Sequence, residues 1–68
     1  MNKNKLKAKM IEFGDNAQSL AECLGICRTR LSAKINEYKG AEFTQTEIKK
    51  MIERYNLSDE ETNSIFFA

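Results

Sequence analysis

The feature that most constrains the fold is a break of only three residues, Gly25, Ile26 and Cys27, between two helical patterns. In segment 17–24 the apolar residues recur with the spacing of a helix, and a second such pattern begins at Arg28. So short a break does not let two helices lie antiparallel over their length. We therefore expect them to cross at a steep angle.

The side chains around this break suit a close crossing. Ala21 is small enough for close contact, and Gly25 can adopt the left-handed conformation that the turn needs. Ile26 can fill the corner between the helices, and Leu31 can anchor the second one. Two helices crossing steeply over a short turn is the geometry of the DNA-binding helix-turn-helix, so the segment predicts that motif.

Start and stop signals predict three more helices, and thus an all-α fold of five short helices. Asn16 is a good N-cap for the helix that Gly25 ends. Two S/T-x-x-E capping boxes, at 44–47 and 58–61, predict helices that begin beside them. The expected ranges are about 3–13, 17–24, 28–37, 45 onward and 59–66. The residues expected to face inward are Leu6, Met10, Phe13, Ala17, Leu20, Ala21, Leu24, Leu31, Ile35, Tyr38, Ile48, Met51, Ile52, Tyr55, Thr62, Ile65 and Phe66.

Length and composition bound what the chain can be. At 68 residues it is a single domain, 1–68, whose small core predicts marginal stability and help from a second copy. It has no proline, no internal repeat and no alternating strand-like stretch. With 41% apolar and 31% charged residues, a globular domain is expected rather than a disordered one.

What the sequence lacks argues against several functional classes. No apolar run approaches the roughly 18 residues of a membrane span, so we expect a cytoplasmic protein without a membrane partner. Cys23 and Cys27 have no His and no further Cys to join them, which predicts free thiols and neither metal nor cofactor. Without His, an evident carboxylate pair or a phosphate-binding glycine loop, we expect no enzyme and no small-molecule substrate.

The charge is unevenly distributed along the chain. Residues 1–40 carry eight Lys or Arg and four Asp or Glu, a net charge of +4, whereas residues 41–68 carry three and six, a net charge of −3. Such polarity favours a nucleic-acid binder with a separate association surface. The lysines of the first helix either steer the protein toward DNA or only solvate that helix: Lys3, Lys5, Lys7 and Lys9.

The helix expected over 28–37 supplies the candidates for reading bases. At about 100° per residue, an inward direction set by Leu31 and Ile35 leaves Thr29 and Ala33 pointing away from the core. The N-terminal end of such a helix is the part that enters the major groove. There an arginine can donate two hydrogen bonds to guanine, and Thr or Ala can contact a thymine methyl group. The base-reading candidates are Arg28, Thr29, Arg30, Ser32 and Ala33.

Phosphate contacts are expected from helix starts and from polar groups that flank the base-reading helix. Free backbone amides and the helix dipole favour anions at a helix start. The candidates are Asn16, Ala17, Gln18, Lys34, Asn36, Lys39 and Thr44.

The stretch QSLAECLGICRTRLSAKIN, residues 18–36, resembles the helix-turn-helix of phage Cro and lambda-repressor-like regulators. The segments on either side are similar to those of a short phage and Firmicute subgroup, so the resemblance covers nearly the whole chain. It implies a compact five-helix DNA-binding domain that binds an operator, commonly as a homodimer, and controls transcription. The family usually carries Gln at the position of Ala17, whose side chain cannot take that role, and Gln18 is the nearest substitute.

The C-terminal sequence SIFF supplies the candidate dimer interface. Phe66 and Phe67 are adjacent and cannot both face one core, so one is expected to pack and the other to be exposed. In the resembled family the last helix often lies at the dimer interface, which implies a role there for Ile65, Phe66 and Phe67. A frayed end with one exposed Phe is the alternative.

The sequence as a whole predicts a sequence-specific DNA-binding transcriptional regulator, a phage-type repressor or Cro-like protein. Its recognition helix would enter the major groove of a palindromic operator as part of a homodimer. The alternative is a protein-interaction or antitoxin-like module with the same fold and weak or no specific DNA binding. The net charge of only +1 and the lack of Gln at Ala17 favour that alternative.

Cys27 stands at the expected N-cap of the helix that begins at Arg28, where a hydroxyl or carboxylate would accept a hydrogen bond from a backbone amide. A thiol is a weak acceptor, so Cys27→Ser should raise the free energy of unfolding by about 0.5–1 kcal/mol. Thermal and chemical denaturation measure the change. An unchanged melting temperature would mean that residue 27 does not cap this helix.

Overall fold

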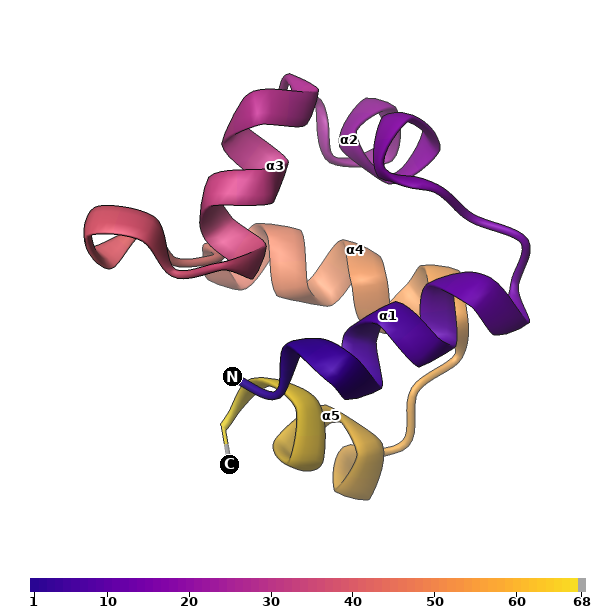
Figure 1. The fold of residues 1–68 in the computed structure, drawn as a ribbon. Helices are drawn as coiled ribbons and strands as arrows, with labels where there is room; N and C mark the ends of the chain where they lie inside the picture. The colour runs from indigo at the N-terminus through magenta and orange to yellow at the C-terminus, as the bar shows by residue number, and fades with distance from the viewer. Residues whose placement is uncertain (68) are drawn as a thin grey trace.

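Five α-helices and one short 3-10 helix make up the fold, which a computed structural model describes for residues 1–67 (Figure 1). The helices are α1 (Lys3–Glu12), α2 (Ala17–Leu24), α3 (Arg28–Ile35), α4 (Gln45–Tyr55) and α5 (Asp59–Phe66), and the 3-10 helix η1 covers Tyr38–Gly40. The described residues contain no strand, which confirms the predicted all-α class. No helix in this range is long and apolar enough to cross a membrane.

The helices begin where the capping signals predict. Thr44 Oγ1 accepts a hydrogen bond from the Glu47 amide at 3.2 Å, and the Glu47 carboxylate accepts one from the Thr44 amide at 2.8 Å. Ser58 and Glu61 form the same reciprocal pair, with both bonds at 3.1 Å. Asn16 caps α2, because its side chain accepts a bond from the third amide of that helix at 2.8 Å. These local bonds satisfy amides that have no partner inside the helix.

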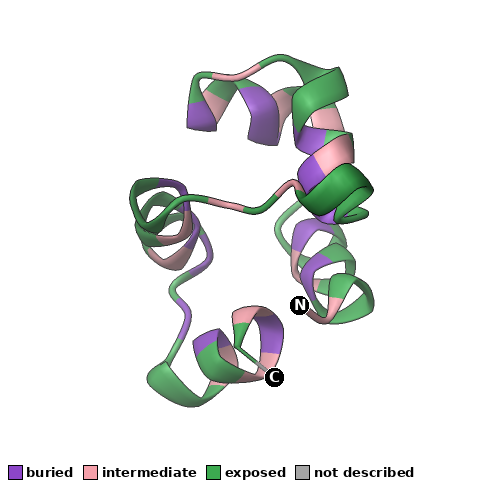
Figure 2. Ribbon diagram, turned by 90° about the vertical axis from the view of Figure 1, so that its left-hand side faces the viewer, coloured by how far each residue is buried: buried purple, intermediate pink, exposed green. Residues whose placement is uncertain are grey.

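One apolar core lies between the helices. In Figure 1, α1 and α5 lie side by side on one side of α4, and α2 and α3 lie on the other. Figure 2 shows the buried residues on the inner sides of the helices and the exposed ones on the outer sides. The buried apolar residues are Leu6, Met10, Leu20, Ala21, Leu24, Leu31, Ile35, Met51, Tyr55, Leu57 and Ile65. The described part of the molecule is compact, with principal extents of 27 × 24 × 21 Å.

The turn between α2 and α3 has the expected short form. Gly25 closes α2 in the left-handed conformation, with φ 72° and ψ 27°. The Ile26 amide donates to the Ala21 carbonyl at 3.0 Å, and the Ile26 side chain packs against the core. Cys27 is the N-cap of α3, and its thiol makes no capping hydrogen bond. The two helices contact each other and cross steeply, as Figure 1 shows.

Two aromatic side chains predicted to face the core are exposed instead. α3 ends at Ile35 rather than near residue 37, because Glu37 adopts the left-handed conformation with φ 54°. Tyr38 therefore leaves the helical register and is 62% exposed. Phe13 lies just beyond the end of α1 and is 49% exposed, with its ring against that of Tyr55 at a centroid distance of 5.3 Å.

Asp15 joins the loop between α1 and α2 to α4. Its carboxylate accepts two hydrogen bonds from the Arg54 guanidinium, both at 2.6 Å, and one from the Tyr55 hydroxyl at 2.6 Å. Ser19 Oγ donates a further bond at 2.7 Å. The Arg54 guanidinium holds the pKa of the Asp15 carboxyl well below its usual value, with help from Tyr55 and Ser19, although burial opposes this. The Asp15 side chain is only 5% exposed, so the ionised carboxylate is part of the folded structure.

The depressed pKa of Asp15 makes stability depend on pH. Its contribution should be complete above about pH 4, the ordinary carboxyl range, and should be lost as pH falls through the lower folded-state pKa. Asp15→Asn should lower the free energy of unfolding by about 2 kcal/mol at pH 7, and by less as the solution becomes acidic. Urea unfolding measured from pH 2 to pH 7 tests this. Glu53→Gln, on an exposed carboxylate of α4, is the control, and a pH-independent deficit in Asp15→Asn would contradict the assignment.

Candidate nucleic-acid interface

The predicted base-reading residues of α3 lie on its solvent side. Leu31 and Ile35 anchor the opposite side in the core, with exposed fractions of 0% and 7%. Ala33 is half-buried, and the other four candidates are exposed: Arg28, Thr29, Arg30 and Ser32. Arg28, Thr29, Ser32 and Ala33 line one groove on this side, whereas Arg30 is exposed outside the groove lining.

The two arginines of this surface have no acidic partner among residues 1–67. All ion pairs in that part of the chain are made by other groups, and neither Arg28 nor Arg30 takes part in one. Both lie in the first turn of α3, where the helix dipole is positive and where Cys27 supplies no side-chain acceptor. Neither arginine at this end of α3 therefore has its charge neutralised by an ion pair within residues 1–67.

A shallow groove of about 470 Å³ runs along the exposed side of α3. Five of its lining residues belong to α3 or its C-cap, and the sixth, Tyr38, comes from η1. The lining is Arg28, Thr29, Ser32, Ala33, Asn36 and Tyr38. The sequence pattern did not identify Tyr38 as part of this surface, because it placed the ring on the core side of a longer helix.

The phosphate candidates at the start of α2 have local roles. Asn16 is exposed and uses its side-chain oxygen to cap the helix. Ala17 is half-buried, so only its backbone amide remains for a contact of the predicted kind. The Gln18 amide group donates a hydrogen bond to Glu22 at 3.0 Å, which holds this side chain beside an acid on its own helix. Gln18 is therefore a poor replacement for the Gln that Ala17 lacks.

The phosphate candidates after α3 are exposed. The Asn36 side chain donates to the Ser32 carbonyl at 3.0 Å, which turns its amide group back over α3. Lys39 has its ammonium nitrogen 5.4 Å from the centre of the Tyr38 ring. Thr44 uses its hydroxyl to cap α4. Lys39 is the one cation among them and lies beside the groove on α3.

Lys34 was predicted to contact phosphate, but its buried position in the structure contradicts this prediction. The residue is only 8% exposed, and its Nζ lies 2.6 Å from Glu47 Oε1. Burial by itself would raise the pKa of Glu47, but the hydrogen bonds from Lys34 and the Thr44 amide outweigh it and lower that pKa. The ammonium group thus joins α3 to α4 inside the protein and is not available to DNA.

Three of the four N-terminal lysines also have partners within the molecule, and the first of them, Lys3, donates a hydrogen bond to Asn36 Oδ1 at 3.5 Å. Lys9 pairs with Glu61 at 2.5 Å and with Glu12 at 3.3 Å, and both acids raise the pKa of its ammonium group. Lys5 donates a hydrogen bond to Ser64. The contacts with Glu61 and Ser64 tie α1 to α5, and together with that of Lys3 they favour a structural role for the series over attraction of DNA.

The three C-terminal residues predicted to form a dimer interface differ in how far they are buried. Ile65 is 2% exposed and belongs to the core, so its predicted place in an interface is wrong. Phe66 packs partly against the core, in an edge-to-face contact with Phe43 at a centroid distance of 6.2 Å. Phe67 is 66% exposed. The expectation that one Phe packs while its neighbour is exposed is confirmed.

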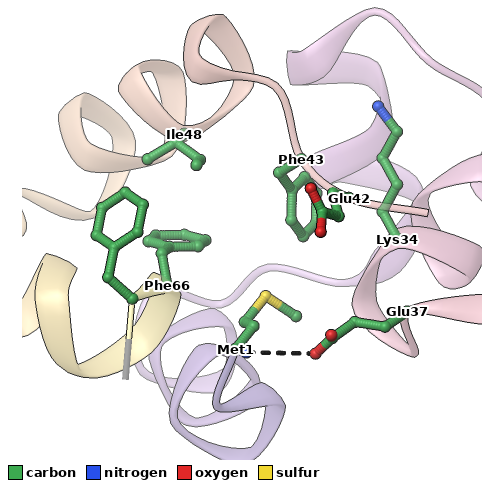
Figure 3. A pocket seen from close by; sticks show the side chains of 8 residues that line it. Met1, Lys34, Glu37, Glu42, Phe43, Ile48 and Phe66 are labelled. Carbon is green, nitrogen blue, oxygen red and sulfur yellow. Dashed lines mark hydrogen bonds and ion pairs between the residues drawn. The ribbon is translucent and has the colours of Figure 1, made fainter. Parts of the chain in front are cut away.

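A pocket of about 250 Å³, with apolar and charged residues in its lining, opens beside these phenylalanines (Figure 3). Met1, Phe43 and Ile48 line it together with both residues of the Phe pair. The Met1 ammonium group forms an ion pair with Glu37 at 3.3 Å, drawn as a dashed line in Figure 3. Exposed Phe67 and this pocket offer a partly apolar surface for association.

Neither a metal site nor a disulfide is present in the described chain. Among residues 1–67, no three His, Cys, Asp or Glu side chains gather so that they could hold a metal ion. Cys23 and Cys27 are both free thiols.

Comparisons of the chain with protein-family models, with curated proteins and with solved structures found no match.

The buried position of Lys34 predicts a stability role. Lys34→Met keeps the length of the side chain but leaves the Glu47 carboxylate without its partner, and should lower the free energy of unfolding by about 3 kcal/mol. Urea denaturation measures this change. Lys49→Met, on the exposed side of α4, is the matched control and should change stability by less than about 0.5 kcal/mol. Equal stability of the two variants would show that the ion pair is not needed.

Proposed function

We propose that this protein is a sequence-specific DNA-binding regulator of the lambda-repressor-like, Cro-type kind, with α2 and α3 as its helix-turn-helix. The observation that carries the proposal is the exposed side of α3. It holds two arginines without acidic partners in residues 1–67, at the N-terminal end of a helix that follows a short turn. In a helix-turn-helix this is the end that reads base edges.

The chemistry of the α3 surface suits the major groove of DNA. Arg28 and Arg30 can each donate two hydrogen bonds to the O6 and N7 atoms of a guanine. Thr29 and Ala33 each offer a small apolar group, which suits contact with a thymine methyl group. The opposite side of α3 stays in the core, so insertion of the helix into a groove does not require the domain to unfold.

Phosphate contacts would flank α3 on both sides. The N-terminus of α2 offers backbone amides at Ala17 and Gln18, and the polar side chain of Asn16 lies beside them. On the other side, Lys39 and the start of α4 at Thr44 offer a cation and further amides. Such contacts position a protein on DNA but do not read its sequence.

A homodimer on a palindromic operator completes the proposal. Phe67 and the adjoining pocket offer a surface that a second copy can cover. Two copies would place their α3 helices in successive major grooves, about 34 Å apart. Ile65 supports α5 from inside the core rather than contacting the partner.

The second candidate function is a protein-interaction module with the same fold. The hydrogen bond between Gln18 and Glu22 favours it, since α2 then has no free glutamine to support a DNA backbone contact. In that case the exposed Phe67 and the pocket beside it would bind a different protein. Absence of salt-dependent DNA binding would support this candidate over the regulator.

Selection of bound duplexes from a random DNA pool tests the regulator directly. We expect one enriched half-site, repeated in inverted orientation with a centre-to-centre spacing of about one helical turn. Arg28→Ala and Arg30→Ala should each weaken binding to the selected duplex by about 5- to 150-fold, as expected for the loss of a bidentate contact to guanine.

Lys50→Ala is the matched control, because it also removes one exposed positive charge but lies on α4. It should weaken binding much less than either arginine variant. If all three variants bind equally well, the assignment of α3 is wrong. If no duplex is enriched, the protein is not a sequence-specific DNA binder.

A further inference from the structure

Tyr38 forms a wall of the groove on α3 without belonging to that helix. Its ring is 62% exposed and lines the groove with Thr29 and Ala33. Within residues 1–67 its hydroxyl forms no hydrogen bond with another side chain. The core therefore does not account for the placement of this aromatic side chain.

The backbone around Tyr38 is held in a strained form. Glu37 and Lys39, its two neighbours, both have left-handed conformations, with φ values of 54° and 52°. Residues with a Cβ rarely adopt this conformation, and it persists only where the surrounding structure imposes it. Here the Glu37 amide donates to the Lys34 carbonyl at 3.3 Å and the Ala41 amide to the Tyr38 carbonyl at 3.0 Å. The loop thus defines the backbone position of Tyr38 beside α3, although burial of the ring does not offset the strain.

The lining of the groove combines apolar and hydrogen-bonding groups. The Thr29 methyl group, the Ala33 Cβ and the Tyr38 ring are apolar. Arg28, Ser32 and Asn36 contribute hydrogen-bonding groups to the same groove. A ligand that suits this lining carries a small apolar group beside hydrogen-bonding groups.

We propose that the groove between α3 and Tyr38 binds the 5-methyl group of a thymine, and that Tyr38 thereby contributes to sequence specificity. This inference rests on the proposed DNA-binding function. Thymine is the one base of unmodified DNA that presents a methyl group in the major groove, beside a hydrogen-bonding edge. Lys39, whose ammonium nitrogen lies 5.4 Å from the ring centre, then neutralises a phosphate next to that base.

The test compares two random duplex pools, one synthesised with thymine and one with uracil, which differs from thymine only by the missing methyl group. From the thymine pool, the wild-type protein should select at least one position of the half-site as thymine. Uracil at that position should weaken binding of the selected duplex by about fourfold, the factor that one buried methyl group contributes. Fluorescence anisotropy measures the ratio of the two affinities.

Variants assign the methyl contact to Tyr38. Tyr38→Ala should bring the thymine-to-uracil affinity ratio to about one, whereas Tyr38→Phe should keep it, since the ring and not the hydroxyl makes the contact. Ile11→Ala is the control, because Ile11 is an exposed apolar residue of α1 outside the groove. It should leave the ratio unchanged.

The outcomes separate this inference from the proposed function. If a sequence is enriched but wild-type protein binds its thymine and uracil forms equally, the DNA-binding function stands and the methyl contact is refuted. The contact is also refuted if Tyr38→Ala keeps the ratio or if Tyr38→Phe loses it. If neither pool yields an enriched sequence, both proposals fail together. The wild-type comparison decides the question even if Tyr38→Ala does not fold.

Discussion

The ion pair between Lys34 and Glu47 fixes the orientation of α3 together with the buried side chains of Leu31 and Ile35. The two groups are 2.6 Å apart and nearly buried, and a charge left there alone would be costly. Rotation of α3 about its own axis would break this pair, so the helix is held with Lys34 inward. Helical spacing then places Thr29 and Ala33 on the solvent side. Burial of Lys34 on one side of α3 therefore leaves the opposite side, which is proposed to read DNA, exposed to solvent.

Charge pairing elsewhere in the fold reduces the set of residues that can meet a partner. Lys9 binds Glu61 and Glu12, and Arg54 is held by the buried carboxylate of Asp15. A count of Lys and Arg in the sequence thus overstates the positive charge that is free at the surface. Arg28 and Arg30 are exposed, take part in no ion pair of residues 1–67 and lie at the N-terminal end of α3, and this is why the proposal rests on them rather than on net charge.

Agreement between sequence and structure is best where the signal is local. The starts of α2, α4 and α5 were predictable, because Asn16, Thr44 and Ser58 each cap an amide within three residues. The end of α3 was not. Glu37 and Lys39 take left-handed conformations although neither is Gly, Asn or Asp, so their residue types carry no signal for such a loop. The same deviation moved Tyr38 from the expected core to the candidate interface.

The sequence by itself determined the class of the fold and the steep crossing of α2 and α3, because these follow from capping and from a short turn at Gly25. Only the tertiary structure decided which side chains are free. In the sequence, Lys34 and Arg28 are both cations of one helix. In the structure, Glu47, thirteen residues after Lys34, forms an ion pair with Lys34 and not with Arg28. Likewise Ile65 enters the core while Phe67 stays exposed. Such differences depend on partners brought close by folding, and no local pattern encodes them.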